Sequence, residues 1–227
     1  MKKVDTILSE LVRWIVGKGV GNYIEYDYNP YTSFETHTLN EEKGIQQVRE
    51  ELKELITVLL ETENLDRCLE IGLGFFGSTH FLFRQMFKNV ITIEHNFERI
   101  RLFGRNTKKY YNEFVLSNGK SKFYHGTSNG VNTVSDVYTN EEPIDFLFID
   151  GNHSYEQVLA DYLMYSPLVK RGGVIAFHDT ILVKGYNEAV PNLMTEIKNG
   201  KYTNGDNIKL HNIHKSKTQG ISYFYKK

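Results

Sequence analysis

A glycine-rich segment is the feature that most constrains how this chain folds. Residues 67–79 join a short apolar run to Gly72, Gly74 and Gly77 and then to the start of a helical pattern. The spacing G-x-G-x-x-G permits a tight turn, close approach of a ligand to the backbone and close packing of a helix on the preceding strand. The segment therefore predicts a strand, a nucleotide-type loop and a helix, although the same glycines could serve packing alone.

Short apolar runs alternate with helical patterns from this segment onward. Such alternation implies right-handed crossovers and a mostly parallel sheet that is covered on both faces, so the predicted fold class is α/β and doubly wound. A short helix after Pro191 and two strand-like runs at 208–213 and 221–225 complete the pattern. The other expected elements are strands at 67–71, 90–94, 122–125, 144–149 and 174–177, and helices from Ser78, at 97–111 and at 154–169.

The chain ahead of the glycine-rich segment carries patterns of its own. Residues 4–16 place apolar side chains at helical spacing, and this stripe is expected either to pack on the main core or to form a subunit interface. Residues 22–37 mix aromatic and polar residues without a regular period, as in a lid over a substrate or a loop wrapped over a core. Thr38 and Glu41 form a capping-box pattern that predicts the start of a further helix.

Length and composition indicate one main domain with appendages. The 227 residues, 40% of them hydrophobic, can bury one substantial core, and we expect residues 1–62 to be an N-terminal helical and lid extension of a domain over 63–227. The formal net charge of -1 argues against a broad electrostatic footprint for nucleic acid. No apolar run approaches membrane-spanning length, and the single cysteine, Cys68, falls in a strand that should be buried. These features favour a cytoplasmic protein that binds neither nucleic acid nor membrane.

Two glutamates bear on the ligand that the glycine-rich loop would hold. Glu70 lies two residues before Gly72, where its carboxylate would repel a pyrophosphate and attract a cation. Glu94 ends the next apolar run, where an acidic residue can bind ribose hydroxyls. A ligand that has a ribose and a positively charged amino acid part, and no phosphate, suits both carboxylates.

The glycine-rich loop flanked by Glu70 and followed by Glu94 resembles the S-adenosylmethionine (SAM) site of class I methyltransferases. The resemblance implies a seven-stranded Rossmann-like sheet that ends in an antiparallel strand pair. It also implies that SAM is the cofactor and that residues 63–227 form the catalytic domain that binds it. The cofactor-binding residues that we expect on this basis are Glu70, Gly72, Gly74, Gly77, Ser78, Glu94, His95, Thr127, Ser128 and Asp150.

A second group of polar residues closes two later strands. Asp150 and Asp179 each follow an apolar run, and His178 directly precedes Asp179. Both carboxylates should face one crevice if the strands are neighbours, because ligands bind at the carboxyl ends of parallel strands. Two carboxylates beside an imidazole suit a hard divalent ion such as magnesium or manganese, which would lower the pKa of an attacking hydroxyl. His153, at the start of the following helix, is placed to take the proton.

The residues around these two strand ends form the pattern Asp150-Gly151-x-His153-x-Tyr155, Gly172-Gly173 and His178-Asp179. This pattern resembles metal-dependent O-methyltransferases of the macrocin and macrolide-sugar type. The resemblance implies Asp150, His178 and Asp179 as metal ligands, and Asp150 and His153 as catalytic residues, with His153 the general base. The position of His178 is often a glutamate in those enzymes.

The sequence favours a SAM-dependent O-methyltransferase that acts on a hydroxyl of a small molecule or sugar with the help of a divalent metal. The alternatives are a metal-independent methyltransferase of RNA or protein and a non-catalytic cofactor-binding subunit. A nicotinamide-dependent reductase is disfavoured by Glu70. Asp150 could also serve only to cap the following helix, where Ser154 and Gln157 form another capping-box pattern. The apolar stripe of the N-terminal helix is compatible with a homo-oligomer.

Overall fold

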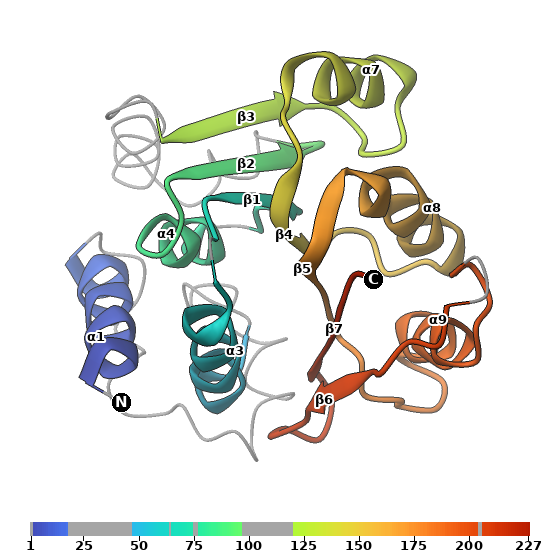
Figure 1. Cartoon of the computed structure of the whole chain (residues 1–227). Coiled ribbons are helices and arrows are strands. Elements are labelled where there is room, and N and C mark those ends of the chain that lie inside the picture. The colour runs from blue at the N-terminus through green and yellow to red at the C-terminus, as the bar shows by residue number, and fades with distance from the viewer. Residues whose placement is uncertain (1, 18–46, 64, 75–76, 97–119, 204–205) are drawn as a thin grey trace.

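The computed structural model describes residues 2–17, 47–63, 65–74, 77–96, 120–203 and 206–227, with the backbone alone for residues 2 and 12–17. The expected helix at 97–111, the aromatic segment at 22–37 and the capping box of Thr38 and Glu41 lie outside these residues. The elements shown in Figure 1 are α1 (Lys2–Gly17), α3 (Arg49–Glu61), β1 (Arg67–Ile71), α4 (Ser78–Arg84), β2 (Asn89–Glu94), β3 (Ser121–His125), α7 (Val131–Asn140), β4 (Ile144–Ile149), α8 (Tyr155–Tyr165), a 3-10 turn (Ser166–Leu168), β5 (Val169–His178), α9 (Ala189–Lys198), β6 (His211–Ile213) and β7 (Ile221–Tyr225).

The strands form one seven-stranded sheet in the order β3-β2-β1-β4-β5-β7-β6. Strands β1 to β5 pair in parallel, whereas β7 is antiparallel to both of its neighbours, β5 and β6. The chain runs outward from β1 through β2 to β3 and then returns to the other side of β1 as β4. The order in which strands are added therefore reverses between β1 and β4. The predicted doubly wound α/β fold with a C-terminal antiparallel pair is therefore confirmed.

The central strands are apolar at successive positions because helices cover both faces of the sheet. Cys68, Phe146 and Phe148 belong to the core that includes the buried side chains of α1, α3 and α4. Leu69 and Ile71, which alternate with Cys68 along β1, belong to the core on the side of α8 and α9. Figure 1 shows these two groups of helices on opposite sides of the sheet.

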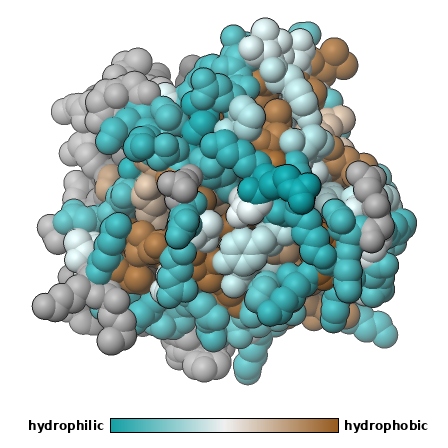
Figure 2. Space-filling model, in the orientation of Figure 1, coloured by the Kyte–Doolittle hydropathy of each residue, from teal (hydrophilic) through white to brown (hydrophobic). Residues whose placement is uncertain are grey.

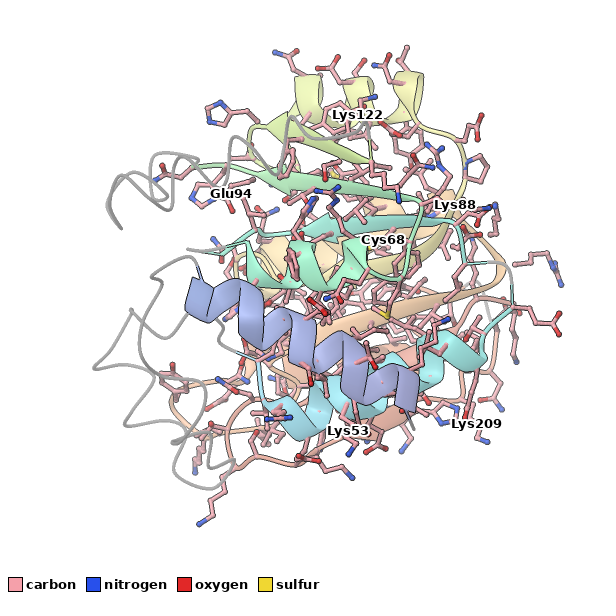
Figure 3. The ribbon with its side chains drawn as sticks, turned by 90° about the vertical axis from the view of Figure 1, so that its left-hand side faces the viewer. Lys53, Cys68, Lys88, Glu94, Lys122 and Lys209 are labelled. Carbon is pink, nitrogen blue, oxygen red and sulfur yellow. The ribbon has the colours of Figure 1, made fainter. Side chains whose placement is uncertain are left out.

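Helix α1 contributes directly to the first of these cores. The side chains of Val4, Ile7, Leu8 and Leu11 are buried in the cluster that they share with α3 and α4. Figure 3 shows α1 lying over these two helices, with Cys68 behind them against the sheet. Packing of the apolar stripe on the main core is thus confirmed for these four residues. The domain division after residue 62 and a homo-oligomer stay predictions.

Helix α8 is shorter than the sequence predicts. The expected helix runs over 154–169, but α8 ends at Tyr165 and strand β5 already begins at Val169. Pro167 explains the difference. Its ring would clash with the preceding turn of a continued α-helix, and it has no backbone N–H to donate to that turn. The prediction of a capping box by Ser154 and Gln157 is also wrong, because the Ser154 side chain makes no capping hydrogen bond. The Ser154 N–H instead donates to Asn152 Oδ1 at 2.8 Å.

Helix α7, between β3 and β4, was not expected from the sequence. It is rich in valine, threonine and asparagine, which have low helix propensity. It buries only Thr133 and Val137. The poor propensity hides this crossover helix, although parallel strands need a crossover connection, which is usually a helix.

The surface in the orientation of Figure 2 is mostly hydrophilic, with apolar side chains showing between polar ones. Among the described residues, no helix combines the length and the apolar character that crossing a membrane requires. Cys68 is buried in β1 as predicted, and burial together with the nearby negative charge of Glu70 raises the pKa of its thiol. Cys68 therefore acts as a small core residue.

Candidate functional site

The glycine-rich loop that joins β1 to α4 adopts backbone angles that other residues rarely permit. Gly72 has a φ of 92°, and Gly74 and Gly77 each have a φ of 66°. An added Cβ at Gly72 would overlap the backbone of Asp150, whereas at Gly74 it would meet no atom of the described residues within 4 Å. The loop therefore packs tightly on the end of β4 at Gly72, whereas at Gly74 the described part of the chain leaves room for a ligand.

Glu94 lies beside this loop at the carboxyl end of β2. Its Oε2 accepts a hydrogen bond from the Leu73 N–H at 3.0 Å, and its Oε1 accepts one from the Asn96 N–H at 2.8 Å. His95 is half exposed, and its Nδ1 lies 3.1 Å from Glu94 Oε1. Figure 3 shows Glu94 at one end of the sheet and Lys88, which precedes β2, at the other. The predicted ribose-binding carboxylate is thus in contact with the glycine-rich loop.

Glu70 is completely buried rather than open to the crevice. Its Oε2 accepts a hydrogen bond from Thr92 Oγ1 at 2.7 Å and lies 3.5 Å from His80 Nδ1. Burial lowers the pKa of His80, although Glu70 acts in the opposite direction. Glu70 Oε1 is buried and has no hydrogen-bond partner among the described residues. This free acceptor lies two residues before the loop, and its contact with a cofactor stays a prediction.

The segment after β3 is fixed to helix α8. Ser128 is buried, and its hydroxyl donates to Asp161 Oδ1 at 2.5 Å and accepts from Gln157 Nε2 at 2.9 Å. The Tyr165 hydroxyl donates to the Ser128 carbonyl oxygen at 2.5 Å. Thr127, by contrast, is exposed. Of the two residues predicted to contact the adenine, Ser128 is thus held by α8 and Thr127 is open to solvent.

The remaining predicted cofactor residue is Ser78, the first residue of α4. It is buried directly after Gly77. Its position at the end of the glycine-rich loop agrees with the spacing of the motif. The roles of Ser78, His95, Thr127 and Ser128 in cofactor binding stay predictions.

The second predicted group comes together at the ends of β4 and β5. The register pairs Ile149 with Phe177, so Asp150 and His178 follow next to one another on neighbouring strands. His178 Nδ1 lies 3.2 Å from Asp150 Oδ1 and 3.1 Å from Asp179 Oδ2. His153 Nε2 lies 3.1 Å from Asp179 Oδ2 and 3.7 Å from Asp150 Oδ1. We call Asp150, His153, His178 and Asp179 the strand-end cluster.

Charged neighbours and hydrogen bonds together outweigh burial in setting the pKa values of Asp150, His153 and His178. Burial alone would raise the pKa of Asp150, but the charge of His178 and hydrogen bonds with both histidines hold it well below its usual range. Burial would lower the pKa of His178, yet the charges of Asp179 and Asp150 raise it well above the ordinary value. The pKa of His153 is also raised, because its hydrogen bond with Asp150 and the charge of Asp179 outweigh burial. The two carboxylates thus attract positive charge strongly.

The strand-end cluster has the donors of a divalent cation site. One ligand atom each from Asp150, His153 and Asp179 lie within 4.8 Å of one another. This set differs from the predicted ligands Asp150, His178 and Asp179 in its third member, although His178 Nδ1 is as close to both carboxylates. Carboxylate oxygens with an imidazole nitrogen suit magnesium or manganese.

Two residues that sequence reasoning did not find also contact the strand-end cluster. Gln47 is buried just before α3, and its Nε2 donates to Asp150 Oδ2 at 2.5 Å. Asn187 Nδ2 donates to the carbonyl oxygens of Asp179 at 2.6 Å and Ile181 at 3.0 Å. Neither residue belongs to a recognisable motif, and the contact of Gln47 spans 103 positions of the chain. No local signal could have identified them.

Comparison with known families identifies the central part of the chain. Residues 69–180 match the model of a family described as a methyltransferase domain. This range contains the glycine-rich loop, Glu94 and the whole strand-end cluster. Gln47 and Asn187 lie outside it.

Solved structures of O-methyltransferases share the fold. TomG from Streptomyces achromogenes, in complex with SAM, is 14% identical, with a TM-score of 0.60 over 96% of this chain and 96% of its own. An O-methyltransferase from Bacillus cereus, in complex with S-adenosylhomocysteine (SAH), is 15% identical, with a TM-score of 0.57 over 97% of this chain and 91% of its own. MycE of the mycinamycin biosynthetic pathway, in complex with Mg, SAH and mycinamycin VI, is 15% identical, with a TM-score of 0.53 over 75% of this chain and 47% of its own.

A curated relative matches over a shorter stretch. An uncharacterized protein of Acanthamoeba polyphaga mimivirus is 36% identical over 63 residues, which make up 26% of this chain and 28% of that protein. The match thus covers little more than a quarter of the viral protein.

Proposed function

We propose that this chain, whose residues 69–180 match a methyltransferase domain and whose fold is that of class I SAM-dependent O-methyltransferases, transfers a methyl group from SAM to a hydroxyl of a small molecule or sugar, assisted by a divalent metal ion. The near-neutral net charge of -1 supports a small acceptor over RNA. We further propose that the protein acts in the cytoplasm.

The observation that carries the proposal is the position of Asp150. Its backbone packs against Gly72 of the glycine-rich loop, and its side chain belongs to the strand-end cluster. A methyl donor held by the loop and an acceptor oxygen held at the cluster would therefore be neighbours. Such alignment is the main requirement of a bimolecular transfer, since orienting two reactants removes much of the entropic part of the barrier.

The residues around the loop fit the cofactor. The open space at Gly74 lets a ligand approach the backbone, and the Glu94 carboxylate beside it offers acceptors for ribose hydroxyls. Glu70 Oε1 is a buried acceptor without a hydrogen-bond partner among the described residues, as expected where a donor is to be bound. SAM supplies a methyl group on a positively charged sulfur, so the protein has to align the acceptor and remove its proton.

The strand-end cluster fits a divalent metal. Asp150, Asp179 and the Nδ1 atom of His178 would hold the ion, because this buried nitrogen lies 3.2 Å from Asp150 Oδ1 and 3.1 Å from Asp179 Oδ2. A divalent ion supplies Lewis acidity that lowers the pKa of the acceptor hydroxyl. The presence of Mg in MycE, a structural neighbour of low identity, agrees with this assignment.

His153 is then the general base. Its side chain is 49% exposed, against 3% for that of His178, so it can face an acceptor that enters from solvent. Asp179 Oδ2, 3.1 Å from His153 Nε2, orients the imidazole and stabilises its protonated form. The alternative arrangement, with His153 as the third ligand, predicts that His153→Ala loses metal, whereas a general base can be removed with metal binding retained.

Calorimetric titration with SAH, with and without magnesium, tests the proposal. Wild-type protein should bind SAH, Glu94→Ala should lose this binding, and Asp150→Ala should keep much of it while losing transfer to hydroxylated acceptors. A chelator should abolish transfer, and added magnesium should restore it. Absence of SAH binding by the wild type would remove the basis of the proposal, and full activity in chelator would refute the role of the metal.

A further inference from the structure

Gln47 connects the chain ahead of the methyltransferase domain to the strand-end cluster. Its side chain is buried, and its Nε2 lies 2.5 Å from Asp150 Oδ2. An ionised carboxylate can only accept hydrogen bonds, so the amide nitrogen of Gln47 must be the atom that faces it. A hydrogen bond of this kind, with a charged acceptor, is stronger than one between neutral groups.

The two oxygens of Asp150 have separate partners. Oδ1 faces His178 Nδ1 at 3.2 Å and His153 Nε2 at 3.7 Å, on the side where the cation would bind. Oδ2 faces Gln47, and among the described residues the histidines contact Oδ1 and not Oδ2. The two oxygens of an ionised carboxylate are equivalent, but rotation by less than a half-turn would break the hydrogen bond from Gln47. The contact thus fixes the plane of the carboxylate, with one oxygen on Gln47 and the other toward the histidines of the cluster.

Gln47 itself is held by a rigid part of the fold. The next residue, Val48, is completely buried, and its carbonyl oxygen accepts the first hydrogen bond of helix α3 from the Leu52 N–H at 2.9 Å. Helix α3 in turn buries Leu52, Leu55 and Ile56 against the sheet. An amide that is anchored in this way can fix the orientation of a neighbouring group, as the outer-shell partners of metal ligands do.

We propose that Gln47 is a positioning residue of the cation site, which holds Asp150 so that Oδ1 faces the metal. The inference rests on the proposed metal-assisted function and adds to it a residue outside the matched range 69–180. It assigns to the segment before α3 a part in the site, since the ligand orientation depends on a side chain from that segment. Loss of an outer-shell partner typically weakens metal binding by about 10–100-fold.

The test compares Gln47→Met with a matched control, Gln85→Met. Methionine keeps the length and approximate volume of glutamine but cannot donate. Gln85, after α4, also donates one hydrogen bond, from Nε2 to the Ile7 carbonyl oxygen at 3.3 Å, and no contact between it and the strand-end cluster is recorded among the described residues. Binding of Mn²⁺ to each protein is measured by electron paramagnetic resonance without SAM or acceptor, and unfolding in urea is measured on the same metal-free samples.

Gln47→Met should raise the Mn²⁺ dissociation constant by about 10–100-fold, and Gln85→Met should leave it at the wild-type value. Equal Mn²⁺ affinity of wild type and a folded Gln47→Met, even with lower stability, would show a merely structural role and overturn the inference. If Gln47→Met does not fold, Gln47→Asn takes its place, because its amide is one methylene too short to reach Asp150. Weaker Mn²⁺ binding by this variant would again support the inference, and wild-type Mn²⁺ affinity would overturn it. A wild type that binds SAH but no Mn²⁺ would refute the metal assistance itself, which is a different result from a failure confined to Gln47.

Discussion

Gly72 packs directly on Asp150: an added Cβ at position 72 would overlap the Asp150 carbonyl oxygen, and the φ of Gly72 is 92°. The contact follows from the pairing of β1 with β4, in which Ile71 and Ile149 are partners immediately before these two residues. The glycine-rich loop and the strand-end cluster are thus joined through backbone atoms, so neither can shift without the other.

Gly72→Ala should destabilise the protein more than Gly74→Ala. Both positions have positive φ, where a Cβ costs about 1–2 kcal/mol, but only Gly72 adds an overlap with neighbouring backbone, which costs about 1–3 kcal/mol more. Urea unfolding of the two variants and the wild type measures the difference. Equal losses of unfolding free energy would show that the two strands separate easily at this point. Gly74→Ala should instead lower SAH affinity, because its methyl group enters the open space.

Asn187→Ala should weaken metal binding through Asp179. Asp179 has a φ of 57°, which is rare for a residue with a side chain, and Asn187 Nδ2 donates to its carbonyl oxygen at 2.6 Å. Without that donor the conformation loses its support, at a cost of about 1–3 kcal/mol in unfolding free energy. The exposed residue Asn192 supplies the control, since Asn192→Ala should change the stability by less than about 0.5 kcal/mol.

Titration of both variants with Mn²⁺ completes this test. Asn187→Ala should bind the ion more weakly than the wild type and Asn192→Ala should bind it equally well. If Asn187→Ala kept wild-type Mn²⁺ affinity while losing stability, Asp179 would hold its position without Asn187.

The fold could be predicted from the sequence because the sheet is covered on both faces. Short runs that are almost wholly apolar, such as 144–149 with its single Asp145, favour strands of this kind, and their alternation with helical patterns indicates the parallel topology. The residues of the strand-end cluster could be predicted for the same reason, since Asp150 directly follows such a run and His178 and Asp179 follow another. Helix α7 could not be predicted with the others because its polar and β-branched residues have low helix propensity.

The partners of the site residues could not be predicted in the same way. Gln47 and Asn187 reach the strand-end cluster through tertiary packing, and no residue type or spacing marks them in advance. Glu70 is predicted to face a ligand, and the structure adds contacts of its Oε2 with Thr92, its register partner on β2, and with His80 of α4, which the sequence does not indicate. Motifs therefore indicate which residues matter and leave their orientation to the packing.

Glu51→Gln should destabilise the protein, because Glu51 anchors the turn between β6 and β7. This fully buried carboxylate of α3 accepts hydrogen bonds from the N–H groups of Lys215 at 2.8 Å, Ser216 at 3.0 Å and Gly220 at 3.2 Å. Both Glu51 oxygens accept, whereas glutamine has a single acceptor oxygen, so the bonds on one side weaken and those on the other are lost, with an expected cost of about 1–3 kcal/mol. Glu54→Gln, which removes an exposed ion pair with Lys215, should cost less than about 1 kcal/mol in the same urea unfolding experiment. Equal effects would mean that the turn is held by other contacts.

Asp161 should make stability fall as the pH rises from about 4 to about 6. Burial raises the pKa of Asp161 from 3.8 to about 6, although hydrogen bonds from Ser128 and Gln157 oppose the shift. Because the folded state binds the proton more tightly than the unfolded chain, the stabilising effect is complete below pH 3.8 and is lost as the pH passes 6. The displacement corresponds to about 3 kcal/mol, so it should be visible above the contributions of other groups.

Asp161→Asn isolates this effect, since asparagine keeps an acceptor for Ser128 and does not ionise. The free energy of unfolding of the wild type relative to this variant should decrease by about 2.4 kcal/mol between pH 4 and pH 7, because only the wild type must ionise a buried carboxyl group. Urea unfolding at intervals of half a pH unit measures the difference. Parallel curves for the two proteins would show that Asp161 titrates near its ordinary pKa. A wild type that gains stability relative to the variant as the pH rises would show that the hydrogen bonds from Ser128 and Gln157 outweigh burial and favour the ionised form.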